Sequence, residues 1–145
     1  MKKLMLLLAA ILTISTPVAR AQEDHAYTEG PVLFVSFIRT EPGMFDEYMR
    51  YLASTYKHIM EESKKQGIIT DFAVYSTIPR TDKDADVILT VTYKNMAALD
   101  NLNARTDPIS KKVWGSLPKS AQAFADRGKM RKDVGNQIIR QLILK

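Results

Sequence analysis

The pattern of hydrophobic and polar positions divides this chain of 145 residues into segments with two different periods. The stretch Gln22–Gly30 is short and polar, and we expect it to be a flexible terminus of the mature chain. Residues 32–38 are apolar at almost every position and rich in β-branched and aromatic side chains, which is typical of a strand covered on both faces. From Met44 to Gln66 the apolar residues recur every three or four positions, which predicts an amphipathic helix. One face of this helix holds Phe45, Met49, Leu52, Tyr56, Ile59 and Ser63.

Two further strands are predicted at 68–78 and 86–93, because both segments are β-branched and aromatic. The polar turn at 79–84 favours an antiparallel hairpin between them. One face of the first of these strands is expected to carry Phe72, Val74, Ser76 and Ile78.

Capping residues and prolines divide the segment between Asn95 and Val134 into three helical stretches. We expect Asn95 to cap the first, Asp107-Pro108 to begin the second and Ser116-Leu117-Pro118 to begin the third. The third is expected to run to about Val134, with an inward face made of Ala121, Phe124, Ala125 and Gly128.

The last segment, Gln137–Lys145, suits either a strand or a helix, because its apolar residues fit both periods. We predict a strand, since Gly135-Asn136 would end the preceding helix and the remaining run is short. The order is then β-α-β-β-α-β, that of an α+β, ferredoxin-like fold with an antiparallel sheet and an enlarged second helical segment. Residues 31–145 are expected to form this single domain.

The first 21 residues have the features of a secretory signal peptide. Two lysines precede an apolar run at Leu4–Ile14, and Ala19-Arg20-Ala21 is a small-x-small cleavage pattern. We therefore predict a secreted protein, in the periplasm of a Gram-negative bacterium or the medium, with no membrane association after cleavage. The apolar run is too short to be a permanent anchor.

Composition and charge narrow the functional classes. The chain has no cysteine, which excludes a disulfide framework, a lipid-modified cysteine and thiol catalysis. Loss of residues 1–21 lowers the formal net charge from +5 to +2, so basicity gives no reason to expect a nucleic-acid partner. The mature charge is uneven, with −5 over 22–104 and +7 over 105–145. The positive half either steers an anionic partner or is a solvated helical face.

Several segments together resemble the dimeric α/β-barrel superfamily, in particular its small secreted bacterial members. The segments that carry the resemblance are the strand at 32–38 with the following Pro42-Gly43-Met44-Phe45-Asp46-Glu47-Tyr48, the hairpin at 72–93, and Tyr93-Lys94-Asn95-Met96. The resemblance implies that two protomers set their sheets together as a barrel and that ligands sit between a sheet and its helices. The superfamily includes cofactor-free monooxygenases, haem-degrading enzymes, isomerases and non-catalytic stress proteins, so the fold leaves the function open.

The sequence gives no reason to expect a metal or a cofactor. Haem-degrading proteins of this kind carry a histidine in the second helical segment, and residues 95–135 contain none. The run Asp82–Asp86 resembles the start of a calcium loop, but Val87 replaces the required glycine and Tyr93 the required glutamate. His58, on the first helix, is the one candidate general base, and a surface histidine is the alternative.

The remaining candidates are aromatic side chains that would suit a pocket for an apolar or aromatic small molecule. We predict such a site between the sheet and residues 95–134, lined by Tyr48, Tyr75 and Trp114. Arg140 is the one charged residue that could face it, although it could equally lie at the sheet edge. An ordinary packed core is the alternative interpretation of the same aromatic residues.

Two functional classes follow from these residues. One is a non-catalytic binder or structural protein, and the other is a cofactor-free monooxygenase or isomerase acting on an aromatic substrate. A homodimer is expected in either case, because the strands are apolar on both faces while the helices of one protomer cover only one of them.

Overall fold

The computed structural model describes residues 25–145, so the predicted signal peptide and cleavage site lie outside the described residues. Four strands form one antiparallel sheet: β1 (Tyr27–Thr40), β2 (Asp71–Ser76), β3 (Val87–Tyr93) and β4 (Arg131–Leu144). Their spatial order is β2-β3-β1-β4, which is the ferredoxin-like arrangement predicted from the sequence. The final segment is a strand rather than a helix.

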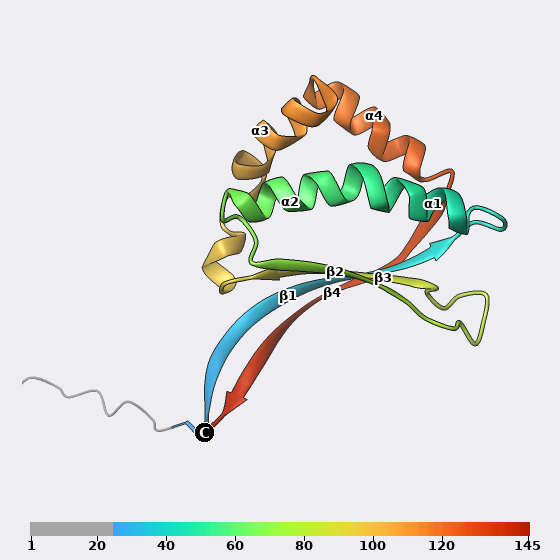
Figure 1. Cartoon of the computed structure of the whole chain (residues 1–145). Helices are drawn as coiled ribbons and strands as arrows, with labels where there is room; N and C mark the ends of the chain where they lie inside the picture. Colours follow the sequence, from blue (N-terminus) through green and yellow to red (C-terminus); the bar gives the residue numbers. More distant parts are fainter. Residues whose placement is uncertain (1–24) are drawn as a thin grey trace, which may run out of the picture.

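All helices lie on one side of this sheet (Figure 1). The first crossover is one continuous helical stretch made of α1 (Phe45–Tyr51), the π-helical turn η1 (Leu52–Tyr56) and α2 (Lys57–Lys65). The second contains a 3-10 turn, η2 (Met96–Leu99), and two helices, α3 (Leu102–Trp114) and α4 (Leu117–Arg127). No helix among residues 25–145 is long and apolar enough to cross a membrane.

Two of the three predicted caps in the second crossover are correct. The Asn95 side chain accepts a hydrogen bond from the Ala98 amide at 3.1 Å, and the Ser116 hydroxyl accepts one from the Lys119 amide at 3.3 Å. The prediction for Asp107-Pro108 is wrong, because Pro108 lies inside α3. Proline costs a helix one backbone hydrogen bond, and burial of the next residue, Ile109, in the core holds α3 across this point.

The predicted end of the third helix is also wrong. α4 ends at Arg127, and Gly135-Asn136 lies inside β4. There Phe37 of β1 pairs with Gly135 and Ile38 pairs with Asp133, so Val134 is the extra residue of a bulge. Pairing with a long partner strand therefore overrides the local signal of the glycine.

Two further predictions differ from the structure, one about the burial of α4 and one about the flexibility of the N-terminal stretch. α4 has no buried residue, and Phe124, expected inward, is 62% exposed. Residues 27–30, part of the stretch expected to be flexible, form the start of β1, where Tyr27 pairs with Leu144 at the end of β4. These paired ends run on beyond the helices as a two-stranded arm (Figure 1).

The core lies between the sheet and the helices in two clusters. One joins Ile38, Val87 and Leu89 of the sheet to Tyr48, Leu52 and Tyr56 of the first crossover. The other joins Val32 and Tyr93 to Ile68, Ile69 and Ile109. Each cluster contains side chains from both the sheet and a crossover, so burial fixes the helices against the sheet.

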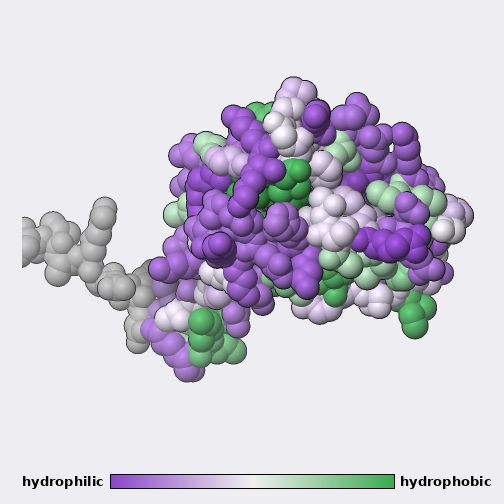
Figure 2. Space-filling model, turned by 45° about the horizontal axis from the view of Figure 1, so that its top comes forward, coloured by the Kyte–Doolittle hydropathy of each residue, from purple (hydrophilic) through white to green (hydrophobic). Residues whose placement is uncertain are grey.

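The opposite face of the sheet has no helix over it (Figure 1). The large apolar residues among the alternate positions that point to this face are Leu33, Val35 and Phe37 of β1, Tyr75 of β2, Ile88 of β3, and Ile139 of β4. Tyr75 and Ile139 are 54% and 46% exposed. The helix side of the molecule, in contrast, is mostly hydrophilic (Figure 2). These six residues are called the open sheet face from here on.

Candidate ligand-binding cleft

The structure does not bring the predicted site residues together. Tyr48 is fully buried in the core, whereas Tyr75 lies on the open sheet face. Trp114 is half-buried at the end of α3, and Arg140 forms an ion pair with Glu29 beside the arm. His58 lies exposed on α2. Tyr48 and Tyr75 therefore cannot contact one small ligand in this arrangement.

The feature that distinguishes the first crossover is its π-helical turn. At η1 the Lys57 amide donates to the Leu52 carbonyl, five residues back. Within this turn, the Ser54 hydroxyl donates to the Arg50 carbonyl at 2.8 Å, which gives that carbonyl a side-chain partner. Single π-helical turns inside α-helices are rare and occur frequently at functional sites.

An apolar cleft of about 170 Å³ lies beside this turn, open to solvent between the helix and β2. Its lining consists of Met49, Leu52, Ala53, Tyr56 and Lys57 from the first crossover and Phe72 and Val74 from β2. An apolar cavity of about 150 Å³ is large enough to bind benzene. The cleft thus has the size and lining for one aromatic ring or a short hydrocarbon group.

Aromatic side chains form one wall of the cleft. The Phe72 ring meets the Tyr56 ring edge-on, with 6.1 Å between the ring centres. Burial raises the pKa of the Tyr56 hydroxyl above its ordinary range, and nearby tyrosines add to the rise. Tyr56 therefore stays neutral at physiological pH and can donate a hydrogen bond, but it cannot act as a base.

The charged end of the cleft is Lys57. Its ammonium lies 3.7 Å from the Glu61 carboxylate, and both side chains are more than half exposed. An exposed pair of this kind contributes little. The Lys57 stem can cover a ligand in the cleft while its ammonium stays in water.

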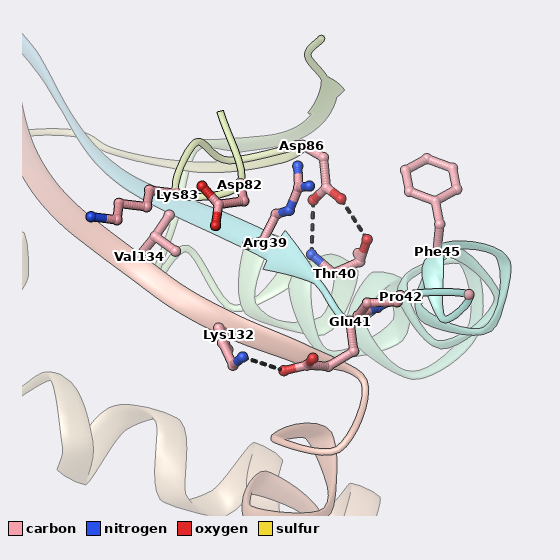
Figure 3. A pocket seen from close by; sticks show the side chains of 11 residues that line it. Arg39, Thr40, Glu41, Pro42, Phe45, Asp82, Lys83, Asp86, Lys132 and Val134 are labelled. Carbon is pink, nitrogen blue, oxygen red and sulfur yellow. Dashed lines mark hydrogen bonds and ion pairs between the residues drawn. The ribbon is translucent and has the colours of Figure 1, made fainter. Parts of the chain in front are cut away.

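The largest hollow described lies elsewhere, where β1 ends (Figure 3). Its volume is about 750 Å³, and its lining includes three cationic and three anionic side chains: Arg39, Lys83, Lys132, Glu41, Asp82 and Asp86. Lys132 already pairs with Glu41 at 3.2 Å, and Asp86 accepts a hydrogen bond from the Thr40 amide at 2.9 Å. The charges in this hollow are balanced and partly paired, so it does not suit an apolar ligand. We interpret it as a hydrated junction that holds the β2–β3 hairpin against β1.

No group of three or more histidine, cysteine, aspartate or glutamate side chains that could hold a metal ion occurs within residues 25–145.

Comparison with known proteins identifies solved structures that have a similar fold. Neither a protein-family model nor a curated protein sequence matches the chain. Among solved structures it is similar to HapK from Hahella chejuensis, with 11% identity and a TM-score of 0.53, over 76% of this chain and 91% of HapK. A dimeric ferredoxin-like protein from an uncultured marine organism is 14% identical with a TM-score of 0.48, over 81% of this chain and 98% of that one. At such identities the likeness to HapK concerns the ferredoxin-like fold alone.

Sequence reasoning placed some residues of the cleft correctly without identifying the cleft. Met49, Leu52 and Tyr56 lie on the apolar helix face that the spacing predicts, and Phe72 and Val74 lie on one strand face as predicted. The signal that was missed is Ala53, a small residue between large ones at the point where the helix faces the edge strand. Its significance depends on the π-helical turn, which the helical period of the sequence does not distinguish from an ordinary α-helix.

Proposed function

We propose that this protein is a secreted homodimer that binds a small apolar or aromatic molecule in the cleft beside η1, without catalysing a reaction. The observation that carries the proposal is the cleft itself, a benzene-sized apolar space at a π-helical turn. Small-molecule sites in proteins are typically concave and mostly apolar, with few polar groups, and this lining has that character.

The ionisable groups of the cleft favour binding over catalysis. Tyr56 and Lys57 are the only ionisable side chains in its lining. The raised pKa of Tyr56 keeps its hydroxyl protonated at neutral pH. His58, the candidate general base, follows Lys57 in sequence but is not part of the lining. A general acid–base catalyst needs a pKa near the working pH within reach of the substrate.

Secretion rests on the sequence of residues 1–21, and dimerisation rests on the open sheet face. Removing the signal peptide would leave Gln22 as the first residue, a few positions before β1 begins at Tyr27. A second copy, set sheet against sheet, would cover the apolar residues that the helices of one protomer leave open.

The first test is cleavage of the signal peptide. Intact-mass measurement of protein exported from a bacterial host should show the loss of residues 1–21, because the apolar run ends in an Ala-x-Ala pattern. A secreted form that still contains Leu4–Ile14 would contradict the predicted cleavage site.

The second test is ring binding in the cleft. Fluorobenzene added to the mature protein should show a shifted and broadened fluorine resonance in NMR. In Ala53→Phe the new ring would occupy the cleft, so we expect affinity to fall at least about tenfold, the equivalent of about 1.4 kcal/mol. Ala121→Phe is the matched control, because Ala121 is an exposed helical alanine on α4, outside the cleft lining.

Equal binding by the wild type and Ala53→Phe would exclude the cleft as the binding site. If neither fluorobenzene nor a panel of substituted benzenes binds the wild type, a purely structural dimer becomes the better interpretation. Far-UV circular dichroism of both variants checks that the fold is unchanged.

A further inference from the structure

Three buried polar atoms of the described chain lack a hydrogen-bond partner. They are the hydroxyl of Tyr56 and the Nε atoms of Arg127 and Arg131, and no other side-chain atom within residues 25–145 is in this condition. Buried polar groups in native proteins are nearly always paired, so each exception calls for a partner such as water or a ligand.

The two arginines converge on one pair of stacked tyrosines. The guanidinium carbon of Arg131 lies 5.9 Å from the centre of the Tyr48 ring, and that of Arg127 lies 5.5 Å from the centre of the Tyr51 ring. The Tyr48 and Tyr51 rings stack with 6.1 Å between their centres. The charges of both arginines lower the pKa of the Tyr48 hydroxyl, against the larger rise caused by burial.

The Tyr56 hydroxyl is a separate case. The Tyr56 ring lines the cleft described above and meets the ring of Phe72 on β2, whereas Arg131 begins β4 at the opposite edge of the sheet. Neither arginine is among the charges that act on the Tyr56 hydroxyl, so this hydroxyl does not belong to the group that the two arginines form.

The charges around these tyrosines do not balance. Arg131 is 11% exposed at its side chain and lies 3.7 Å from the Asp133 carboxylate. Arg127 has no ion pair within the described residues. Guanidinium groups remain charged in proteins, so two cations face one carboxylate, and one of these cations, Arg131, is largely buried. Buried charges require a partner of opposite sign.

We propose that Arg127 and Arg131 form a binding site for the carboxylate of a small molecule. Asp133 balances the charge of one arginine, so one positive charge remains. A ligand with a single negative charge would neutralise it, which favours a monoanion over phosphate. The planar fork of a guanidinium fits a carboxylate with two parallel hydrogen bonds, and Nε is one of its donors.

The elements that carry the two arginines allow a small molecule to reach the proposed carboxylate site. Arg127 is the last residue of α4 and Arg131 the first of β4, with only Gly128–Met130 between them. Because α4 has no buried residue, a small outward movement of this helix would cost little apolar burial. The carboxylate site does not depend on the ring site in the cleft, and each can fail alone.

Sodium acetate titrated into the mature protein, against sodium chloride at constant ionic strength, tests this proposal. Binding to the folded state alone should raise the folded-to-unfolded ratio about 11-fold at ten times the dissociation constant. Urea unfolding at each acetate concentration measures this ratio. In Arg131→Gln we expect acetate affinity to fall at least about tenfold, because a buried charged partner is removed.

Arg50→Gln is the matched control, because Arg50 is an exposed arginine on α1 that pairs with Glu47. Arg131→Lys is the second variant, since it keeps the charge but loses the fork, and it should also bind acetate more weakly. If Arg131→Gln does not fold, Arg131→Lys and saturation transfer from the wild-type protein to the methyl protons of acetate decide the question.

An acetate effect on the wild type that equals that of chloride would overturn the proposal. The same acetate effect in the wild type and in both Arg131 variants would overturn it too. Stronger stabilisation by phosphate than by acetate would reject the carboxylate in favour of a different anion. The variant Ala53→Phe should respond to acetate as the wild type does, so that failure of the ring site and failure of this site are distinguishable.

Discussion

Replacing Tyr48 with alanine is expected to lower the free energy of unfolding by about 3 to 5 kcal/mol, as for other large aromatic residues in cores. Tyr48 is 1% exposed and packs between α1 and the sheet in the cluster of Ile38 and Val87. Its removal would leave a large cavity and would free the end of α1. Since small domains have a total stability of about 5 to 15 kcal/mol, this one change is expected to bring the protein close to unfolding at 37 °C.

Urea unfolding at one fixed protein concentration measures this loss, and Tyr48→Phe is the control that keeps the ring. Burial raises the pKa of Tyr48 to about 12, so its hydroxyl is neutral in both states at pH 7 and phenylalanine removes no charge. We expect Tyr48→Phe to lie within about 1 kcal/mol of the wild type. A loss of similar size in both variants would show that the hydroxyl, rather than ring packing, stabilises this cluster.

The fold could be predicted from the sequence because its strongest signals are local and periodic. Residues 32–38 and 86–93 are continuous apolar runs, and Met44–Gln66 has a clear helical period. Those signals survive in β3 and the first crossover with shifts of one residue at the ends, and in β1, which is longer than predicted at both ends. The order of elements then specified the sheet, since β-α-β-β-α-β has few compact solutions.

The errors arose where distant partners decide the structure. β4 begins six residues before the predicted strand, at Arg131, because β1 supplies hydrogen bonds along its whole length. Gly135, a good helix terminator by itself, is instead accommodated next to a bulge in that pairing. Local propensity cannot report a partner that lies about a hundred residues earlier in the chain.

The candidate sites were less predictable than the fold for the same reason. Arg127 and Arg131 follow each other closely in sequence, but a helix ends and a strand begins between them. The spacing of residues along a single helix therefore does not predict that these two arginines lie together. The cleft needs Ala53, the π-helical turn and the edge strand at once, and only the last was visible in the sequence as a predicted strand.

The oligomeric state gives the second large effect, and it rests on the proposal that two copies meet through the open sheet face. We expect light scattering after size exclusion to report twice the mature mass for the wild type. The variant Ile139→Lys would place a charge in the interface. Each copy would contribute one such lysine, because a two-fold interface contains each residue from both copies. A buried unpaired charge is costly, so the dissociation constant of the dimer should rise at least about 100-fold.

The neighbouring residue provides the matched control for this experiment. Ile138 lies on the same strand and is 52% exposed, against 46% for Ile139, but its side chain points to the helix side of the sheet. Both lysine variants should fold, because both positions are already half exposed in the single chain. If the open sheet face is the interface, Ile139→Lys becomes monomeric at micromolar concentration while Ile138→Lys stays dimeric. A wild type that is monomeric at that concentration, or a dimer lost equally in both variants, would show that the two copies do not meet through this face.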